Sequence, residues 1–262
     1  MLEKFSIYMT SLQQERIVRV YVPENYHNET KRYPVLYMHD GQNVFEDEGS
    51  IGGTSLGLKD YLDKTGLEII VVGIDQNSVG DGRVNDYCPW PHGKLSEEIL
   101  GYLSPSGGNG EAYLDFIVDE LKPFIDRKYR TIETETAMAG ISLGALITTY
   151  AACRYPHIFR KIAVLSTAYY RNQEAIEAFI EESDLDGIEK FYMDIGTKEV
   201  PEDLAASLLF MELSRKVYGL LSSKIDGIRF AEIIDAEHHY RFFRERIPGI
   251  LSYLFDDVDS RK

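Results

Sequence analysis

Short β-rich runs alternate with longer helical stretches along almost the whole chain. A strand that pairs in parallel with the next one needs a crossover connection, which is usually a helix. The alternation therefore predicts an α/β fold with a mostly parallel central sheet and helices on both faces. The predicted strands span residues 4–9, 16–22, 35–39, 69–74, 136–139, 162–165, 191–195 and 230–234, and the predicted helices span 56–64, 111–129, 143–155, 173–182, 202–223 and 240–255.

Length and composition favour a single domain over residues 1–262. The 262 residues, of which 44% are hydrophobic, are enough to build one large core. One long stretch, 75–110, interrupts the alternation, and we expect it to be a loop at the carboxyl ends of the strands, where ligands bind to α/β sheets. Its aromatic residues Tyr87 and Trp90 either form the wall of a pocket or pack the loop onto the body.

A Gly-x-Ser-x-Gly sequence, Gly140 to Gly144, lies between a predicted strand and a predicted helix. A chain that turns this sharply from strand to helix leaves no room for side chains at the two glycines, and it lifts the serine hydroxyl clear of the backbone. Ser142 is therefore the candidate nucleophile. The same pattern recurs around Ser55, but no strand precedes it there, so we exclude Ser55.

The charge of the chain restricts its partners and its location. A formal net charge of −15 and a pI near 4.9 argue against nucleic acid and anionic membranes as partners, since both are negatively charged. No segment resembles a secretory signal or a membrane span, so we expect a cytoplasmic protein. The two cysteines, Cys88 and Cys153, are expected to form no disulfide.

A serine hydroxyl is a poor nucleophile unless a base takes its proton, and imidazole is the usual base. In hydrolases with a nucleophile elbow the chain order is serine, acid, histidine. Of the six histidines, only His238 and His239 follow the last predicted strand and so satisfy that order. The acid should follow the preceding strand. Glu199 fits this position better than Asp194, which is still inside the strand.

Five sets of residues in chain order carry a resemblance to a known family. They are 37–43 (YMHDGQN), Arg83 with 86–90 (DYCPW), 140–144 with 155–159 behind it (YPHIF), 194–199 (DIGTKE), and 237–238 followed by 243–246 (FRER). Together they resemble the putative-esterase family, the α/β-hydrolase branch that contains esterase D, feruloyl esterase and enterochelin esterase-like proteins. The resemblance implies Ser142 as nucleophile, Glu199 as acid and His238, rather than His239, as base. It implies no metal and no organic cofactor.

An oxyanion hole requires two main-chain N–H donors, one of them on the residue after the nucleophile, which is Leu143. For the second donor the resemblance points to Gln42. The ester pocket is expected to be lined by four aromatic residues, of which the last two fit the core equally well: Phe45, Trp90, Tyr169 and Tyr170.

These observations predict a carboxylic-ester hydrolase that acts on small or aryl esters through an acyl-enzyme on Ser142. Acyl transfer to an alcohol by the same residues is the first alternative, and a non-catalytic binding protein on a hydrolase fold is the second. The second is disfavoured because the nucleophile and the base are both present. Ile141 and Phe243 depart from the residues common in the family, so we expect an altered pocket. The sequence indicates no oligomeric state.

Overall fold

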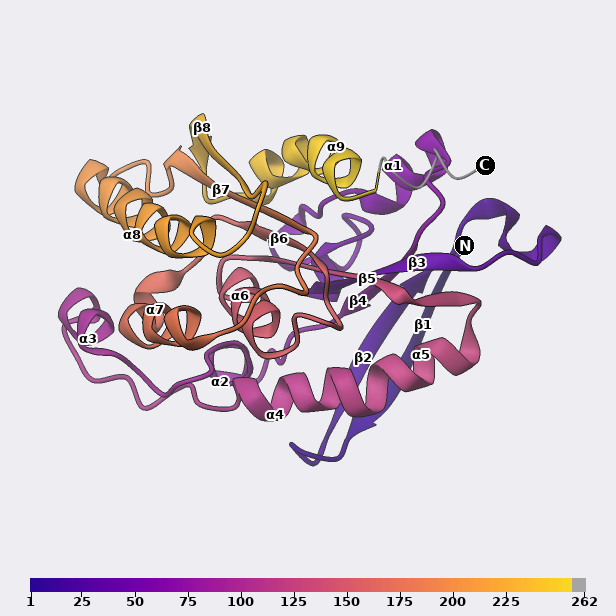
Figure 1. The fold of residues 1–262 in the computed structure, drawn as a ribbon, viewed down its shortest axis with the longest axis horizontal. Coiled ribbons are helices and arrows are strands. Elements are labelled where there is room, and N and C mark those ends of the chain that lie inside the picture. The colour runs from indigo at the N-terminus through magenta and orange to yellow at the C-terminus, as the bar shows by residue number, and fades with distance from the viewer. Residues whose placement is uncertain (256–262) are drawn as a thin grey trace.

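A computed structural model of the chain describes residues 1–255. Its eight strands form one sheet in the order β1-β2-β4-β3-β5-β6-β7-β8 (Figure 1). The pairs β1·β2 and β2·β4 are antiparallel, and all the other pairs are parallel. The strands are β1 Leu2–Met9, β2 Gln14–Tyr21, β3 Tyr33–His39, β4 Ile70–Ile74, β5 Thr131–Ile141, β6 Lys161–Leu165, β7 Lys190–Lys198 and β8 Arg229–Glu237.

Helices cover both faces of the sheet, so the predicted α/β class is confirmed. Helices α1 and α9 lie on one face and the other α-helices on the opposite face (Figure 1), and each face has its own apolar core. Every residue of β3, β4 and β6 is buried, as expected of parallel strands covered on both sides. The helices are α1 Leu58–Thr65, α2 Gly82–Tyr87, α3 Lys94–Leu100, α4 Gly110–Asp115, α5 Lys122–Lys128, α6 Leu143–Arg154, α7 Gln173–Glu182, α8 Leu204–Ser222 and α9 Tyr240–Phe255.

The stretch 75–110 is not the continuous loop that the sequence predicted, because it contains α2 and α3. Both helices have only six or seven residues, which is too short for a helical period to stand out in the sequence. The predicted helix 111–129 is interrupted by a π-helix, Phe116–Leu121. A single domain over 1–262 stays a prediction, since 256–262 lie outside the described residues.

The sheet brings four chain segments to one edge. The parallel strands β3, β5, β7 and β8 end at His39, Ile141, Lys198 and Glu237, and carboxyl ends of parallel strands share an edge. Because β3 pairs with β4 on one side and β5 on the other, this edge also contains the point where the strand order reverses, which is where such sheets bind ligands.

Within residues 1–255, no helix combines the length and the apolar character that a membrane span requires.

Candidate active site

Ser142 occupies a strained turn between β5 and α6. Its φ of 60° and ψ of −119° are uncommon for a residue with a side chain. A Cβ atom at Gly140 would lie 2.0 Å from the Gly144 carbonyl oxygen, whereas one at Gly144 would lie 3.2 Å from the Cβ of His39. The turn therefore requires glycine at 140, while at 144 the contact with β3 is merely tight.

The main chain of Ser142 is anchored on both sides. Its N–H donates to the Leu165 carbonyl at the end of β6 (3.0 Å), and its carbonyl accepts from the Ala168 N–H (3.1 Å). The side chain itself is half-buried. These bonds fix the turn, so the serine side chain stands at the carboxyl edge of the sheet.

His238 and Glu199 are brought together directly after β8 and β7. The distance from His238 Nδ1 to Glu199 Oε2 is 2.6 Å. Glu199 is almost fully buried, and its Oε1 accepts hydrogen bonds from the Ser166 hydroxyl (2.5 Å) and the Gly196 N–H (2.6 Å). Burial raises the pKa of the Glu199 carboxyl, but the bonds from His238, Ser166 and Gly196 outweigh it and leave the pKa below its usual value.

The competing residues from the sequence lie elsewhere. His239 is exposed, and its Nδ1 accepts only from the Arg241 N–H (3.1 Å). Asp194 is buried and pairs with Arg246 (2.8 Å) instead of a histidine. Burial raises the pKa of Asp194 to about 6, although the Arg246 charge works against this. The structure therefore places Glu199, and not Asp194, beside His238.

Gln42 and Leu143, the two expected N–H donors, follow β3 and begin α6. Gln42 lies in a short 3₁₀ helix, Gly41–Asn43, directly beyond β3, and Leu143 is the first residue of α6. In the described part of the chain neither main-chain N–H donates to another protein atom. Gly41 packs so closely on Gly73 that a Cβ there would be 2.5 Å from the Gly73 carbonyl carbon, which holds the loop against the sheet.

Two cavities meet at Ser142 and His238, and Arg83 lines both. The first, of about 320 Å³, is lined by a mixture of polar and apolar side chains, and the second, of about 340 Å³, is largely apolar. Besides the three shared residues, the first is lined by Asp40, Asn43, Ile51, Gln76, Ile141, Tyr240 and Phe243, and the second by Leu143, Ala168, Tyr170, Glu199, Val200 and Phe210.

Of the four aromatic residues expected in the pocket, only Tyr170 lines it, with its ring edge-on to Phe210 (5.3 Å). Phe45 is buried in the core beneath α1 and α9. Tyr169 is fully buried and shares a hydrogen bond with Thr149 (3.0 Å). Trp90 packs edge-on against Tyr150 and Phe179 (5.3 and 5.9 Å). We correct the assignments of Phe45 and Tyr169, because both rings are buried in packing, whereas Trp90 is half-buried and its role at the pocket stays a prediction.

Arg83 and Asp40 form a charged contact that the sequence interpretation did not identify. Arg83 donates two hydrogen bonds to the Asp40 carboxylate, Nε to Oδ1 at 2.7 Å and Nη2 to Oδ2 at 2.9 Å. Asp40 is buried, and its backbone has a positive φ of 55°. Both residues lie within or beside the segments that carried the resemblance, but no local pattern indicates that residues 43 positions apart pair.

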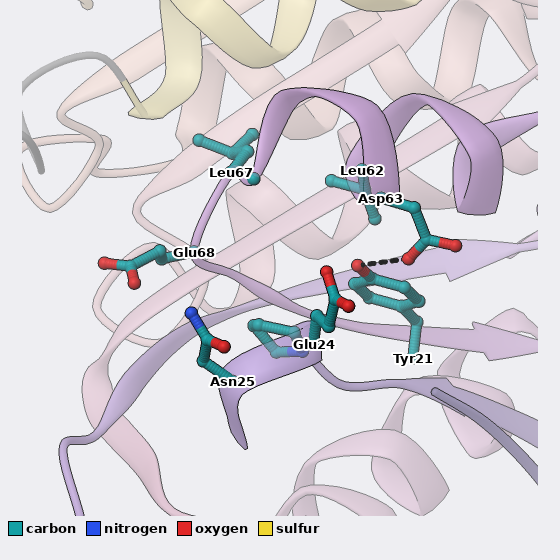
Figure 2. A pocket seen from close by; sticks show the side chains of 9 residues that line it. Tyr21, Glu24, Asn25, Leu62, Asp63, Leu67 and Glu68 are labelled. Carbon is teal, nitrogen blue, oxygen red and sulfur yellow. Dashed lines mark hydrogen bonds between the residues drawn. The ribbon is translucent and has the colours of Figure 1, made fainter. Parts of the chain in front are cut away.

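A smaller cavity, of about 70 Å³, opens beside α1 and shares no residue with the other two. Figure 2 shows the Tyr21 hydroxyl bonded to Asp63 (2.9 Å), while the carboxylates of Asp63 and Glu68 point away from one another. Within residues 1–255 there is no cluster of His, Cys, Asp and Glu able to hold a metal ion.

The comparisons with known proteins cover nearly all of this chain. A profile of the family described as "Putative esterase" matches residues 9–254. The uncharacterized protein YbbA of Bacillus subtilis is 26% identical over 242 residues, covering 90% of this chain and 91% of that protein. An endo-1,4-beta-xylanase/feruloyl esterase of Xylanibacter ruminicola is 25% identical, covering 84% of this chain and 28% of that protein.

Among solved structures, an IroE-like serine hydrolase from Shewanella oneidensis superposes with a TM-score of 0.75 at 20% identity. The match covers 95% of this chain and 79% of that one. The predicted α/β-hydrolase fold is thereby confirmed.

Proposed function

Since the chain belongs to the putative esterase family and is an esterase with the α/β-hydrolase fold, we propose that it hydrolyses carboxylic esters through an acyl-enzyme on Ser142. His238 is the base and Glu199 the acid. The observation that carries the proposal is the cavity edge where Ser142 and His238 meet, with His238 bonded to a buried carboxylate. That carboxylate is held in its ionised form.

Glu199 sets the tautomer of the base. An ionised carboxylate only accepts hydrogen bonds, so Nδ1 of His238 carries the proton and Nε2 is left free to accept one. His238 takes the proton of the Ser142 hydroxyl as the Oγ attacks the ester carbonyl carbon. The buried Glu199 charge then stabilises the imidazolium that forms.

The negative charge of the tetrahedral intermediate develops on the former carbonyl oxygen. The main-chain N–H groups of Gln42 and Leu143 are the donors for this oxygen, since within residues 1–255 neither is bonded to another acceptor. When the intermediate collapses, the bond from carbon to the alkoxy oxygen breaks, and the imidazolium protonates the departing alcohol. Water then attacks the acyl-enzyme with His238 again as base, and the acid and free Ser142 are regenerated.

The two cavities suggest how the two parts of the ester bind. The apolar cavity, with Tyr170 and Phe210 edge-on to each other, suits a flat aryl group or a short alkyl group. The mixed cavity, where Asn43, Gln76 and the Arg83 guanidinium lie beside apolar side chains, suits an uncharged group that carries hydroxyl or amide functions. Arg83 is neutralised by Asp40, so a strongly anionic group has no net positive partner there.

Partner class, location and extent are also proposed. The charge of −15 supports a small-molecule ester as the partner, rather than nucleic acid or a membrane. Both cysteines are free and buried, which supports a reducing compartment such as the cytoplasm. The single sheet of residues 1–255 supports one domain.

The test is the hydrolysis of a panel of p-nitrophenyl and naphthyl esters of increasing acyl length, together with a second set whose acyl groups are aromatic. Wild type should hydrolyse the panel, and Ser142→Ala should not. The control Ser55→Ala should hydrolyse it as wild type does, because Ser55 is fully buried and its hydroxyl donates a hydrogen bond to Asp47. Tyr170→Ala should raise KM for p-nitrophenyl esters with an aromatic acyl group more than it raises KM for p-nitrophenyl acetate. Hydrolysis by Ser142→Ala would refute the proposal, and a product ester formed with an added alcohol would establish acyl transfer instead.

A further inference from the structure

Ser166 is held in an unusual backbone conformation beside the proposed acid. It follows β6 directly, is almost fully buried, and has a positive φ of 46°. A left-handed φ favours glycine, because a Cβ atom makes this conformation costly. A serine that persists there indicates that its hydroxyl does something glycine cannot.

The Ser166 hydroxyl lies between a cation and Glu199. Its Oγ accepts a hydrogen bond from Arg246 Nη1 (3.1 Å) and donates one to Glu199 Oε1 (2.5 Å). An arginine side chain can donate but never accept, and a hydroxyl has a single proton. The direction of the chain is therefore fixed, with the Ser166 proton always pointing to Glu199.

Arg246 is itself fixed by a buried ion pair. It comes from α9, is almost fully buried, and its Nη1 also contacts Asp194 Oδ1 of β7 at 2.8 Å. The other Asp194 oxygen accepts from the Tyr192 hydroxyl (3.0 Å). The segment after β6, strand β7 and helix α9 thus meet at Ser166, and they contribute Ser166, the pair Tyr192 and Asp194, and Arg246 to the hydrogen-bond chain.

We propose that Ser166, oriented by Arg246, is a positioning residue that holds Glu199 in the rotamer that meets His238. The inference rests on the proposed triad. With only the Gly196 N–H on Oε1, that oxygen of Glu199 is oriented by a single donor from β7. The Ser166 hydroxyl adds a second donor to Oε1 from the segment after β6, and a firmly held Oε1 keeps Oε2 directed at His238. Ser166 touches neither cavity, and it acts on the reaction only through Glu199.

The test is a double-mutant cycle between Ser166 and Glu199, with kcat, KM and thermal denaturation measured for each variant. Ser166→Gly and Ser166→Ala should lower kcat by roughly ten- to a hundredfold, the scale expected when a catalytic group loses its alignment, with KM within about twofold. Ser166→Gly should melt no lower than wild type, because glycine accepts the positive φ. The control Ser214→Ala removes a buried hydroxyl without a partner in the described chain and should leave kcat unchanged.

The decisive arm is Ser166→Gly in the Glu199→Gln background, where kcat should not fall any further. An equal fold-loss in both backgrounds would overturn the inference, because Ser166 would then act independently of Glu199. Wild-type kcat in Ser166→Gly combined with a large loss in Glu199→Gln would also overturn it while leaving the proposed triad standing. Wild-type kcat in Glu199→Gln would remove both the triad acid and the inference.

Discussion

Replacing Glu199 by glutamine should trap His238 in the wrong tautomer. The Ser166 hydroxyl and the Gly196 N–H both donate to the position of Oε1. The amide oxygen of a glutamine must occupy that position, which turns its NH₂ group toward His238 Nδ1. An NH₂ group only donates, so Nδ1 becomes the acceptor and the ring proton moves to Nε2. A protonated Nε2 cannot take the proton of Ser142.

The magnitude follows from this geometry. The corresponding exchange of a triad acid for its amide lowers kcat by about 10⁴-fold when it imposes the wrong tautomer, which is about 5 kcal/mol in the activation barrier at about 1.36 kcal/mol per tenfold. KM should change little, because Glu199 is almost fully buried. The melting temperature should also change little, since glutamine has the same shape and keeps the bonds from Ser166 and Gly196.

The assay is steady-state hydrolysis of p-nitrophenyl acetate, with Asp194→Asn as the matched control. That substitution is the same chemical change five residues earlier, inside β7, but Asp194 contacts Arg246 and not His238. It should cost about 3–5 kcal/mol of folding stability, because a buried guanidinium loses its charged partner, while kcat of the folded fraction stays within about tenfold. A Glu199→Gln enzyme that keeps kcat within about tenfold of wild type would refute the reasoning and point to a Ser-His dyad.

Three further predictions concern the histidines and the turn. His238→Ala should lower kcat by about a thousandfold or more, whereas His239→Ala should have little effect because Glu199 is bonded to His238 and His239 lines neither of the two cavities; the reverse ranking would shift the base by one residue. Burial lowers the pKa of His39 from 6.5 to about 4, so its contribution to stability is complete above pH 6.5 and is lost as the pH falls toward 4. Urea unfolding should show a loss of about 3 kcal/mol over that window, and an equal loss in His39→Gln would contradict the assignment. Gly140→Ala should cost about 3 kcal/mol or more in thermal denaturation, since its Cβ would meet a carbonyl oxygen at 2.0 Å, and Gly144→Ala, with a closest contact of 3.2 Å, should cost clearly less.

The fold and the candidate triad were predictable because their signals are local. Each member of the candidate triad directly follows a strand that can be recognised in the sequence by its run of apolar residues: Ser142, Glu199 and His238. Parallel strands put such residues on one edge without further information. The family resemblance then separated His238 from its neighbour.

The rest of the site depends on contacts between distant residues. Arg83 with Asp40, and Ser166 with Arg246, pair over 43 and 80 positions, and no periodicity encodes such pairs. An aromatic side chain suits a core and a pocket equally well, so the sequence could not indicate that Tyr169 packs inside while Tyr170 faces the cavity.

The most direct test of the central claim is mass spectrometry of the protein after reaction with a fluorophosphonate. We expect one phosphonyl group per chain, on the peptide that carries Ser142, with none on the peptide that carries Ser55. Loss of ester hydrolysis should be proportional to the fraction labelled. Label on another residue, or full activity in a completely labelled sample, would contradict the assignment of Ser142 as the nucleophile.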